Sequence, residues 1–455
     1  MTVSDLIQTQ KAAHKKGAMH SLKARTDMLS RLRTMISTHE KELCDAIATD
    51  FGKPYVESYI TEIFTVLQEI DFHLKHLKKW IKPESAGTHV TVFPSKSEVH
   101  HRPFGTVLVI SAWNYPVHLS LMPVIGALSA GNTVVLKPSE LAANTSATLK
   151  KLIDQYFQNQ VFSVVEGAVE ETQDLLKQPF DKIFFTGSSR VGKIVMKAAA
   201  EQLIPVSLEL GGKSPAIIHS DADLEIATRR IWWGKTINAG QTCVAPDYVM
   251  VHETLKSSFI ETSRDVLSSF FQDDYRCGEN YTRIVNEQHF ERLKELLNSS
   301  FVLFGGTVNR DHLFIEPTLI ESEWTDQVMQ EEIFGPLLPL LTYSDPDEMV
   351  EQIRSKPAPL ALYLFTNSDP IQQKVFTGIS FGGGCLNETI SHLGNPHLPF
   401  GGIGNSGMGS YHGKHSFDTF SHKQSILKKP VWPDPDVRYP PYDQEKLKWV
   451  KKLFS

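Results

Sequence analysis

The chain has 455 residues, enough for two or three domains, and its formal net charge of -6 is small for that length. Hydrophobic residues make up 41% and charged residues 22%, as in ordinary globular proteins. The absence of a basic excess argues against a general nucleic-acid binder. No apolar run reaches the roughly 18 residues that a membrane helix needs, so we expect no integral membrane segment.

The cysteines do not form a recognisable framework. Cys44, Cys243, Cys277 and Cys385 are far apart and make no CxxC pair. The first twenty residues are polar and lack a signal-peptide pattern. We therefore expect reduced thiols in a cytoplasmic protein, with neither a disulfide framework nor a metal site.

The first 82 residues have a helical pattern. Apolar positions recur at spacings of three and four in 23–36, 39–50 and 57–81, with a break at 52–54. Residues 88–102 differ, because alternating valines flank Pro94 and its polar neighbours, which predicts a hairpin. A hairpin this polar cannot form its own core. We interpret it as an arm that pairs elsewhere, and a second subunit is one candidate.

A strand and helix alternation follows the arm. Apolar runs predict strands at 106–111, 133–137, 163–166, 182–186 and 205–210, with helices at 118–129, 144–157, 171–176 and 190–203. Continuous apolar strands joined by helices indicate a parallel sheet covered on both faces. Ligands bind beyond the carboxyl ends of such strands, so the loops after Ser111, Lys137 and Thr186 should share one edge.

A second alternation begins after Gly211. We expect strands at 216–218, 248–251, 319–320, 337–343, 360–366 and 378–383, and helices at 227–237, 257–271, 287–300, 349–355 and 371–377. The fold class is therefore α/β, with two parallel-type domains joined near Gly211 and a small β arm. The basic, amphipathic tail at 445–455 is interpreted as a docked terminal helix in preference to a membrane anchor.

Cys243 stands in the stretch Asn-Ala-Gly-Gln-Thr-Cys-Val-Ala-Pro at 238–246. Its neighbours are small or polar, so the thiol has room to face a cleft as a nucleophile. The alternative is a small buried hydrophobic residue, because free cysteine is among the most buried residue types.

Two strand ends carry polar side chains. The Asn114 amide, after the first strand, can donate to an oxygen that gains negative charge, although Asn-Tyr-Pro can also be a simple turn. Lys137 and Glu140, after the second strand, can bind ribose hydroxyls. Alternatively, Ser139 caps a helix there with Glu140 in its first turn.

Three further loops could converge on the cysteine. Gly187 and Gly192 lie between a strand and a helix, where free amides can bind pyrophosphate, although the spacing matches neither standard glycine fingerprint. Glu209 lies between leucines, where burial would raise its pKa toward that of a general base; pairing with Lys213 is the alternative. The segment 331–336 presents an acid and an aromatic residue before a Gly-Pro turn.

Seven motifs occur in one order: Trp-Asn-Tyr-Pro (113–116), Lys-Pro-Ser-Glu (137–140), Phe-Thr-Gly-Ser (185–188), Leu-Glu-Leu-Gly-Gly-Lys (208–213), Gly-Gln-Thr-Cys (240–243), Glu-Glu-Ile-Phe-Gly-Pro (331–336) and Leu-Pro-Phe-Gly-Gly (398–402). The set resembles the aldehyde dehydrogenase superfamily along nearly the whole chain. The short N-terminal extension and the sequence Asn-Ser-Gly-Met-Gly-Ser-Tyr-His-Gly-Lys at 405–414 resemble its class 3 branch.

The resemblance implies roles for individual residues. Cys243 would be the nucleophile and Glu209 the base, with the Asn114 amide and the Cys243 backbone N–H as the oxyanion hole. NAD or NADP would be the cofactor. Lys137 and Glu140 would hold the adenosine ribose and Val191 would lie at the adenine, with Gly187, Ser188 and Gly192 near the pyrophosphate. Glu332 would hold the nicotinamide ribose, Phe334 would lie at the nicotinamide, and Trp113 and Leu210 would line the cleft. Tyr115, Trp233, Thr242 and Phe400 would line the substrate pocket.

The resemblance also implies a domain plan and a reaction. Residues 1–86 and 103–210 would bind NAD(P), 211–420 would form the catalytic domain, 87–102 and about 421–430 the dimer arm, and 431–455 a tail. We expect a homodimer that oxidises medium-chain aliphatic or aromatic aldehydes to acids. His392 and His397 are expected to be loop histidines.

Three alternative functions are compatible with parts of the sequence. A CoA-acylating dehydrogenase usually lacks the glutamate base, so Glu209 counts against it. A thioesterase or esterase using Cys243 and Glu209 would be at most a side activity, because the cofactor loops are intact. A structural protein of the same fold would be expected to have lost Cys243, Glu209 or Asn114, and all three are present.

Overall fold

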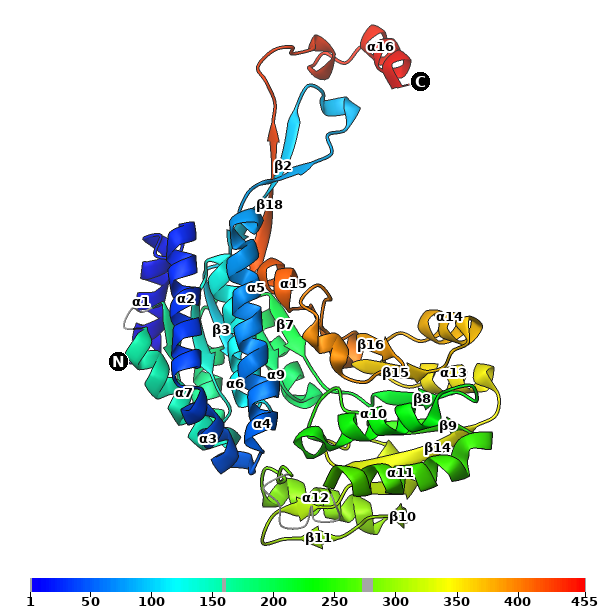
Figure 1. Cartoon of the computed structure of the whole chain (residues 1–455). Helices are drawn as coiled ribbons and strands as arrows, with labels where there is room; N and C mark the ends of the chain where they lie inside the picture. The colour runs from blue at the N-terminus through cyan, green and yellow to red at the C-terminus, as the bar shows by residue number, and fades with distance from the viewer. Residues whose placement is uncertain (1, 158–160, 272–280, 455) are drawn as a thin grey trace.

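A computed structural model describes residues 2–157, 161–271 and 281–454. Figure 1 shows two α/β lobes and a narrow arm that projects away from both of them. Cys277 lies outside the described residues. Within the described part of the chain, no helix is long and apolar enough to cross a membrane.

The N-terminal helices form where the apolar periodicity predicts them. They are α1 (Val3–Lys15), α2 (Leu22–Thr38), α3 (Glu40–Phe51), α4 (Tyr55–Ser58), the π-helix η1 (Tyr59–Phe64) and α5 (Thr65–Trp80). Helix α3 ends at Gly52, whose φ of 63° is the left-handed conformation that a glycine C-cap provides. The predicted break at 52–54 is therefore confirmed.

The first sheet has the strand order β17-β7-β6-β3-β4-β5. Five strands are parallel: β3 (Thr106–Ile110), β4 (Thr133–Lys137), β5 (Phe162–Val164), β6 (Lys182–Thr186) and β7 (Val206–Glu209). The connecting helices are α6 (Pro116–Ala130), α7 (Ala143–Tyr156), α8 (Val169–Leu176) and α9 (Ser189–Ala200). This arrangement confirms the predicted doubly covered parallel sheet and brings the ends of β3, β6 and β7 to one edge.

The second sheet has the order β10-β13-β14-β9-β8-β15-β16. Its strands are β8 (Pro215–Ile218), β9 (Tyr248–His252), β10 (Phe301–Phe304), β13 (Thr318–Glu321), β14 (Leu337–Tyr343), β15 (Ala361–Phe365) and β16 (Gly383–Leu386), of which β10 is antiparallel. Its helices are α10 (Leu224–Thr236), α11 (Lys256–Phe271), α12 (Glu287–Asn298), α13 (Pro346–Arg354) and α14 (Asp369–Gly378), and a small ribbon pairs β11 (Val308–Asn309) with β12 (Phe314–Ile315).

One predicted strand is displaced in the second sheet. The expected strand at 378–383 is wrong, because α14 continues to Gly378 and β16 starts only at Gly383. Its pairing with β15 sets this start, since Gly383 is the partner of Ala361. Close packing selects glycine there, because a Cβ on Gly384 would lie 2.1 Å from the backbone oxygen of Leu362.

The arm is a three-stranded antiparallel sheet of β1 (Glu84–Ala86), β2 (Lys96–Pro103) and β18 (Ser421–Lys428). The predicted hairpin was wrong in its first strand, because Val90–Val92 forms a 3-10 turn and β1 pairs with β2 instead. Strand β2 pairs along its length with β18, so one partner of the arm belongs to the same chain. Residues 421–428 therefore lie in the same sheet as β2, within the range of about 421–430 that was expected to join the arm.

The C-terminal segment runs outward from the arm. Helix α16 (Gln444–Phe454) forms in the predicted place, but Figure 1 shows it beyond the arm and away from both lobes. Trp449 is 49% exposed and Leu447 43%. Among the described residues, the predicted docking is therefore wrong with respect to the two lobes, because the helix lies clear of both (Figure 1).

Two short C-terminal elements return to the first lobe. Strand β17 (Gly407–Met408) pairs antiparallel with β7, and α15 (Gly413–Thr419) packs against α6. The contact is close, because a Cβ on Gly126 of α6 would lie 2.7 Å from the Ser416 side chain. Both elements fall within the predicted catalytic range 211–420, so the chain crosses back to the first sheet before residue 420.

Candidate active site

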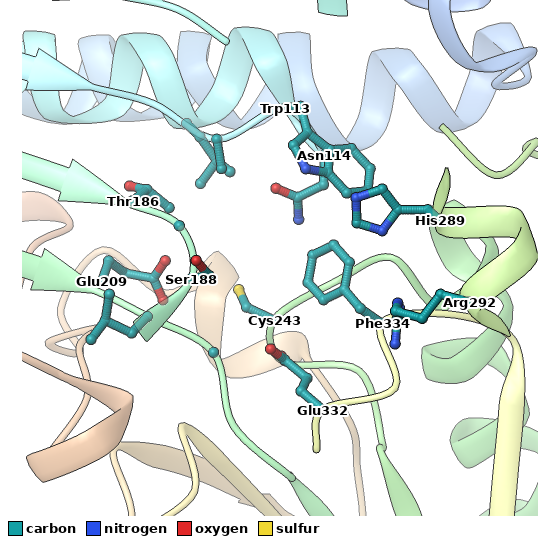
Figure 2. A pocket seen from close by; sticks show the side chains of 15 residues that line it. Trp113, Asn114, Thr186, Ser188, Glu209, Cys243, His289, Arg292, Glu332 and Phe334 are labelled. Carbon is teal, nitrogen blue, oxygen red and sulfur yellow. The ribbon is translucent and has the colours of Figure 1, made fainter. Parts of the chain in front are cut away.

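A cavity with about 680 Å³ of empty space, part of it open to solvent, lies between the edge of the first sheet and the loops of the second lobe. Figure 2 shows side chains from both lobes pointing into it. The lining residues are Ala112, Trp113, Asn114, Leu119, Thr186, Gly187, Ser188, Glu209, Leu210, Gly211, Cys243, His289, Arg292, Glu332 and Phe334. The cavity therefore unites all three predicted catalytic residues with several of the predicted cofactor residues.

Cys243 follows a tight turn at the end of α10. Asn238 and Ala239 both have φ of 52° and Gly240 has φ of 72°, so three successive residues are left-handed. A Cβ on Gly240 would lie 2.3 Å from the Gly335 carbonyl oxygen, so only glycine fits there. The turn directs the half-buried thiol into the cavity (Figure 2).

The thiol lies in an acidic, desolvated environment. Burial raises the pKa of Cys243 well above its usual value, and the nearby Glu209 and Glu332 carboxylates raise it further. Backbone N–H groups of Cys243 and Val244 oppose the shift. The thiolate is therefore disfavoured unless a positive group enters the cavity or one of the acids is protonated.

Glu209 ends strand β7 and is 2% exposed. Burial, and next the repulsion from Glu332, raise its pKa to about 8. The alternative pairing with Lys213 is not found, because the Lys213 ammonium binds Asp247. Glu209 is therefore a desolvated carboxyl group of the kind expected for a general base near neutral pH.

Asn114 is 3% exposed and follows strand β3. Its Nδ2 donates a hydrogen bond of 3.0 Å to the Gln241 carbonyl oxygen, and Asn238 Nδ2 donates one of 2.8 Å to the Asn114 carbonyl oxygen. The first bond occupies one amide hydrogen and fixes the orientation of the amide. The second hydrogen is left for another acceptor, and Figure 2 shows the amide on the side of the cavity that holds Cys243.

The loop that carries Glu332 and Phe334 is held by its backbone. Lys213 donates to the carbonyl oxygens of Val328 and Glu331, and Asp247 accepts the Ile333 N–H at 3.0 Å. Phe334 has φ of 50° and meets the edge of Trp113, with the ring centroids 5.4 Å apart.

Glu332 itself lies against Gly211. Burial, and next Asp247, raise its pKa to about 8. A Cβ on Gly211 would lie only 2.0 Å from Glu332 Oε2, so the glycine makes room for the carboxylate.

The remaining residues that were predicted to bind the cofactor lie around this cavity or beyond it. Ser188 caps α9, and its hydroxyl accepts the Val191 N–H. Gly192 faces Leu210 of the cavity wall, since a Cβ there would lie 2.8 Å from the leucine side chain.

Lys137 and Glu140 lie at the end of β4, outside the cavity lining, with Nζ and Oε2 3.5 Å apart. Ser139 accepts the Leu141 N–H at 3.3 Å, so the capping interpretation is confirmed, while ribose binding stays a prediction.

The four predicted substrate residues are not brought together. Tyr115 and Thr242 share a hydroxyl hydrogen bond of 2.7 Å next to Cys243, but neither lines the cavity. Trp233 is 41% exposed and lines a separate cavity with residues such as Phe270. Phe400 is buried against Tyr411. This substrate wall stays a prediction.

The two loop histidines lie outside the cavity. His392 Nδ1 lies 3.4 Å from Cys385 Sγ, and His397 packs edge-on against Phe72. Neither residue contacts the thiol of Cys243 in the part of the chain that the structure describes. Over the same residues, no group of three His, Cys, Asp or Glu side chains is arranged to hold a metal ion.

Sequence reasoning missed His289 and Arg292 on α12. Their i, i+3 spacing places both on the helix face that closes the cavity. His289 packs beside Trp113 at 5.3 Å, and burial lowers its pKa. Arg292 donates to the Ile333 carbonyl oxygen and so provides a further hydrogen bond that fixes the loop carrying Glu332. The i, i+3 spacing of two polar residues was the signal available in the sequence, but the same spacing is typical of a solvent-exposed helix face.

The cavity suits a dinucleotide. Glu332 Oε1 and Thr186 Oγ1 are buried and have no hydrogen-bond partner among the described residues. Apolar walls of Trp113, Leu210 and Phe334 adjoin the N-terminus of α9, where free amides favour phosphate. Ribose hydroxyls and phosphates would supply the missing partners.

Known proteins resemble this chain along nearly its whole length. A sequence profile of the Aldehyde dehydrogenase family matches residues 1–426. The 4,4'-diaponeurosporen-aldehyde dehydrogenase of Staphylococcus aureus (strain NCTC 8325 / PS 47) is 47% identical over 95% of this chain and 94% of that protein. The dimeric NADP-preferring aldehyde dehydrogenase of Rattus norvegicus is 43% identical over 97% and 98%. The solved substrate-bound state of Staphylococcus aureus AldH superposes with a TM-score of 0.97 at 44% identity, covering 100% of both chains.

The chain belongs to the aldehyde dehydrogenase family. It is an NAD(P)-dependent oxidoreductase that acts on aldehydes. Within the family it is close to the class 3 branch, since further relatives are members of aldehyde dehydrogenase family 3. The predicted family, fold class and enzyme class are confirmed.

Proposed function

We propose that the chain oxidises an aldehyde to a carboxylic acid through a thiohemiacetal and then a thioester on Cys243. One observation carries the proposal: Cys243, Asn114 and Glu209 line one cavity together with Glu332 and Phe334. A thiol, an amide donor and a desolvated carboxylate are the groups that covalent aldehyde oxidation and hydrolysis require.

The chain's residues divide the work between two steps. The Cys243 thiolate attacks the carbonyl carbon, and the carbonyl oxygen gains the charge that the Asn114 amide and the Cys243 backbone N–H stabilise. When bound, the oxidised nicotinamide supplies a hydride acceptor and a positive charge. In the second step Glu209 takes a proton from water, which attacks the thioester carbonyl, and the cysteine sulfur leaves as the acid is released.

The cofactor would be held at both ends. We assign Glu332 to the nicotinamide ribose, Phe334 to the nicotinamide, and Gly187 and Ser188 to the pyrophosphate. We assign Lys137 and Glu140 to the adenosine ribose and Val191 to the adenine, and we place Gly192 in the same turn as the pyrophosphate residues. A carboxylate at position 140 favours the free 2′-hydroxyl of NAD. Because one relative is NADP-preferring, both cofactors belong in the assay.

The substrate class is an apolar aldehyde. We propose medium-chain aliphatic or aromatic aldehydes, with Tyr115 and Thr242 beside the nucleophile and Phe400 and Trp233 further out. The hydrogen bond between Tyr115 and Thr242 supports the first pair. The name of the Staphylococcus aureus relative adds diaponeurosporen-aldehyde to the test panel.

We further propose a cytoplasmic homodimer joined through the arm. The arm exposes large apolar side chains, with Phe93 74% and Val90 65% exposed. A rat relative is dimeric. The division into a cofactor domain (1–86 and 103–210), a catalytic domain (211–420), the arm and the tail is part of the same proposal, with β17 and α15 returning to the first lobe.

The test is absorbance of reduced nicotinamide with NAD and then NADP over a panel of straight-chain and aromatic aldehydes. We expect turnover that Cys243→Ala abolishes and that Glu209→Gln limits to one equivalent of reduced cofactor. Turnover that depends on added CoA would replace hydrolysis by CoA acylation. Failure of folded wild-type protein to reduce either cofactor, with or without CoA, would leave only the structural alternative.

A further inference from the structure

Lys53 and Glu62 form a fully buried ion pair beside the active site. Their side chains are 0% exposed, and Lys53 Nζ lies 2.8 Å from Glu62 Oε1. Removing two charges from water costs free energy that their mutual attraction often fails to recover. Fold stability alone therefore does not account for the pair, and its other contacts are informative.

Both side chains contact the segment that begins α6. Lys53 Nζ lies 3.4 Å from the Asn114 carbonyl oxygen and 4.3 Å from the centroid of the Tyr115 ring. Glu62 Oε2 accepts the Val117 N–H at 2.8 Å, in the first turn of the helix. The pair thus holds the backbone at both ends of the segment 114–117.

The same segment is bonded to the nucleophile loop. Asn114 Nδ2 donates to the Gln241 carbonyl oxygen at 3.0 Å, and the Tyr115 and Thr242 hydroxyls are 2.7 Å apart. Asn238 Nδ2 donates to the Asn114 carbonyl oxygen, so this oxygen accepts from both Lys53 and Asn238.

The loop itself is strained and needs support. Asn238 and Ala239 are left-handed, a conformation that costs free energy in residues other than glycine. The partly buried Glu57 carboxylate accepts the Asn238 N–H at 2.7 Å. Lys53 therefore supports residues 114 and 115. Those two residues in turn hold residues 241 and 242, which lie next to Cys243.

We propose that Lys53, anchored by Glu62, is a positioning residue that fixes the Asn114 amide relative to the Cys243 thiol. The inference rests on the proposed role of Asn114 as oxyanion donor. Lys53 touches no reacting atom and acts only through the 114–117 segment. An oxyanion donor is effective when it is already aimed at the developing charge, and a shift of about 1 Å costs on the order of 100-fold in rate.

The experiment is a double-mutant cycle on kcat. We expect Lys53→Met to lower kcat by about 10- to 100-fold and to leave the KM for NAD nearly unchanged, because no cofactor residue is touched. In an Asn114→Ala background the same substitution should lower kcat by less than about twofold, since the group it positions has been removed.

Lys182→Met is the matched control. Lys182 is another buried lysine, 6% exposed and hydrogen bonded to Ser207 at 2.9 Å, at the opposite end of its strand from the cavity. It should keep the wild-type kcat. If Lys53→Met alone does not fold, Lys53→Met/Glu62→Gln removes the stranded carboxylate, retains an acceptor for the Val117 N–H and enters the same cycle.

The outcomes distinguish the positioning role of Lys53 from the oxyanion role of Asn114. A folded Lys53 variant with wild-type kcat, or a full additional loss in the Asn114→Ala background, overturns the positioning role while Asn114 keeps its own. An Asn114→Ala enzyme with wild-type kcat overturns the proposed oxyanion role itself and the inference with it. If Lys53→Met lowers kcat only when Asn114 is present, the result supports both the positioning role and the oxyanion role.

Discussion

Replacing Gly211 by alanine tests the placement of Glu332 with a single methyl group. The added Cβ would lie 2.0 Å from Glu332 Oε2 and 2.6 Å from its carboxyl carbon, whereas ordinary contact begins at 3.4 Å. The carboxylate oxygen must therefore move by 1.4 Å, the difference between 3.4 and 2.0 Å. Gly211 has no left-handed φ, so the backbone itself accepts alanine.

The expected result is loss of cofactor affinity in a folded protein. Because the obstructing atoms are the far end of a flexible side chain, Tm should change by less than about 3 °C. If Glu332 holds the nicotinamide ribose, a displacement of this size should raise the KM for NAD by about 10- to 100-fold, equivalent to ~1.4–2.7 kcal/mol.

The assay is initial-rate kinetics over a range of NAD concentrations, with Tm measured in parallel. Gly87→Ala is the matched control, since nothing lies within 4 Å of its added Cβ. Gly211→Ala/Glu332→Asp should recover part of the affinity, because the shorter side chain withdraws the carboxylate. A folded Gly211→Ala enzyme with unchanged KM and kcat would refute the placement of Glu332 at the cofactor.

Three other predictions concern charge. Because burial raises the pKa of Glu209 to about 8 and its base form is the carboxylate, kcat for a hydrolysis-limited aldehyde should rise as pH passes through 8; a flat profile from pH 6 to 9 would contradict this. Iodoacetamide should label Cys243 faster with NAD bound, since the nicotinamide charge offsets the acids that raise the thiol pKa; equal rates would exclude that compensation. The raised pKa of Glu332 contributes stability below its ordinary value of 4.5 that is lost as pH rises through about 8. Denaturant unfolding of Glu332→Gln should therefore show a pH slope shallower by up to about 1.4 kcal/mol per pH unit between those values.

The sheets were predictable where burial is two-sided. Strands β4 and β6 were predicted to the residue, because a parallel strand buried on both faces is a continuous apolar run. The arm was harder, because its strands face solvent and their pairing is set by distant residues. Val90–Val92 alternates like a strand but forms a turn, since β2 pairs with β1 and β18 instead.

The site was predictable where motifs mark it. Cys243, Glu209 and Asn114 converge as the order of strands and loops predicts. The supporting residues were not predictable, because Lys53 and Glu62 look like ordinary polar positions in a helical segment until the fold buries them. Trp233 was expected in the substrate pocket only from the family resemblance, and its side chain lines a separate cavity from that of Cys243, so its role stays a prediction.

The return of β17 to the first sheet has a consequence for the order of folding. Strand β7, which ends at Glu209, lies between β6 and β17, and β17 is made only at Gly407–Met408. While the ribosome is still synthesising the second lobe, β7 is therefore an open sheet edge, the kind of surface that recruits foreign strands. Glu209, the proposed base, gains its strand partner Gly407 only after nearly all of the chain has been synthesised. An incomplete chain therefore contains the first lobe without a complete site.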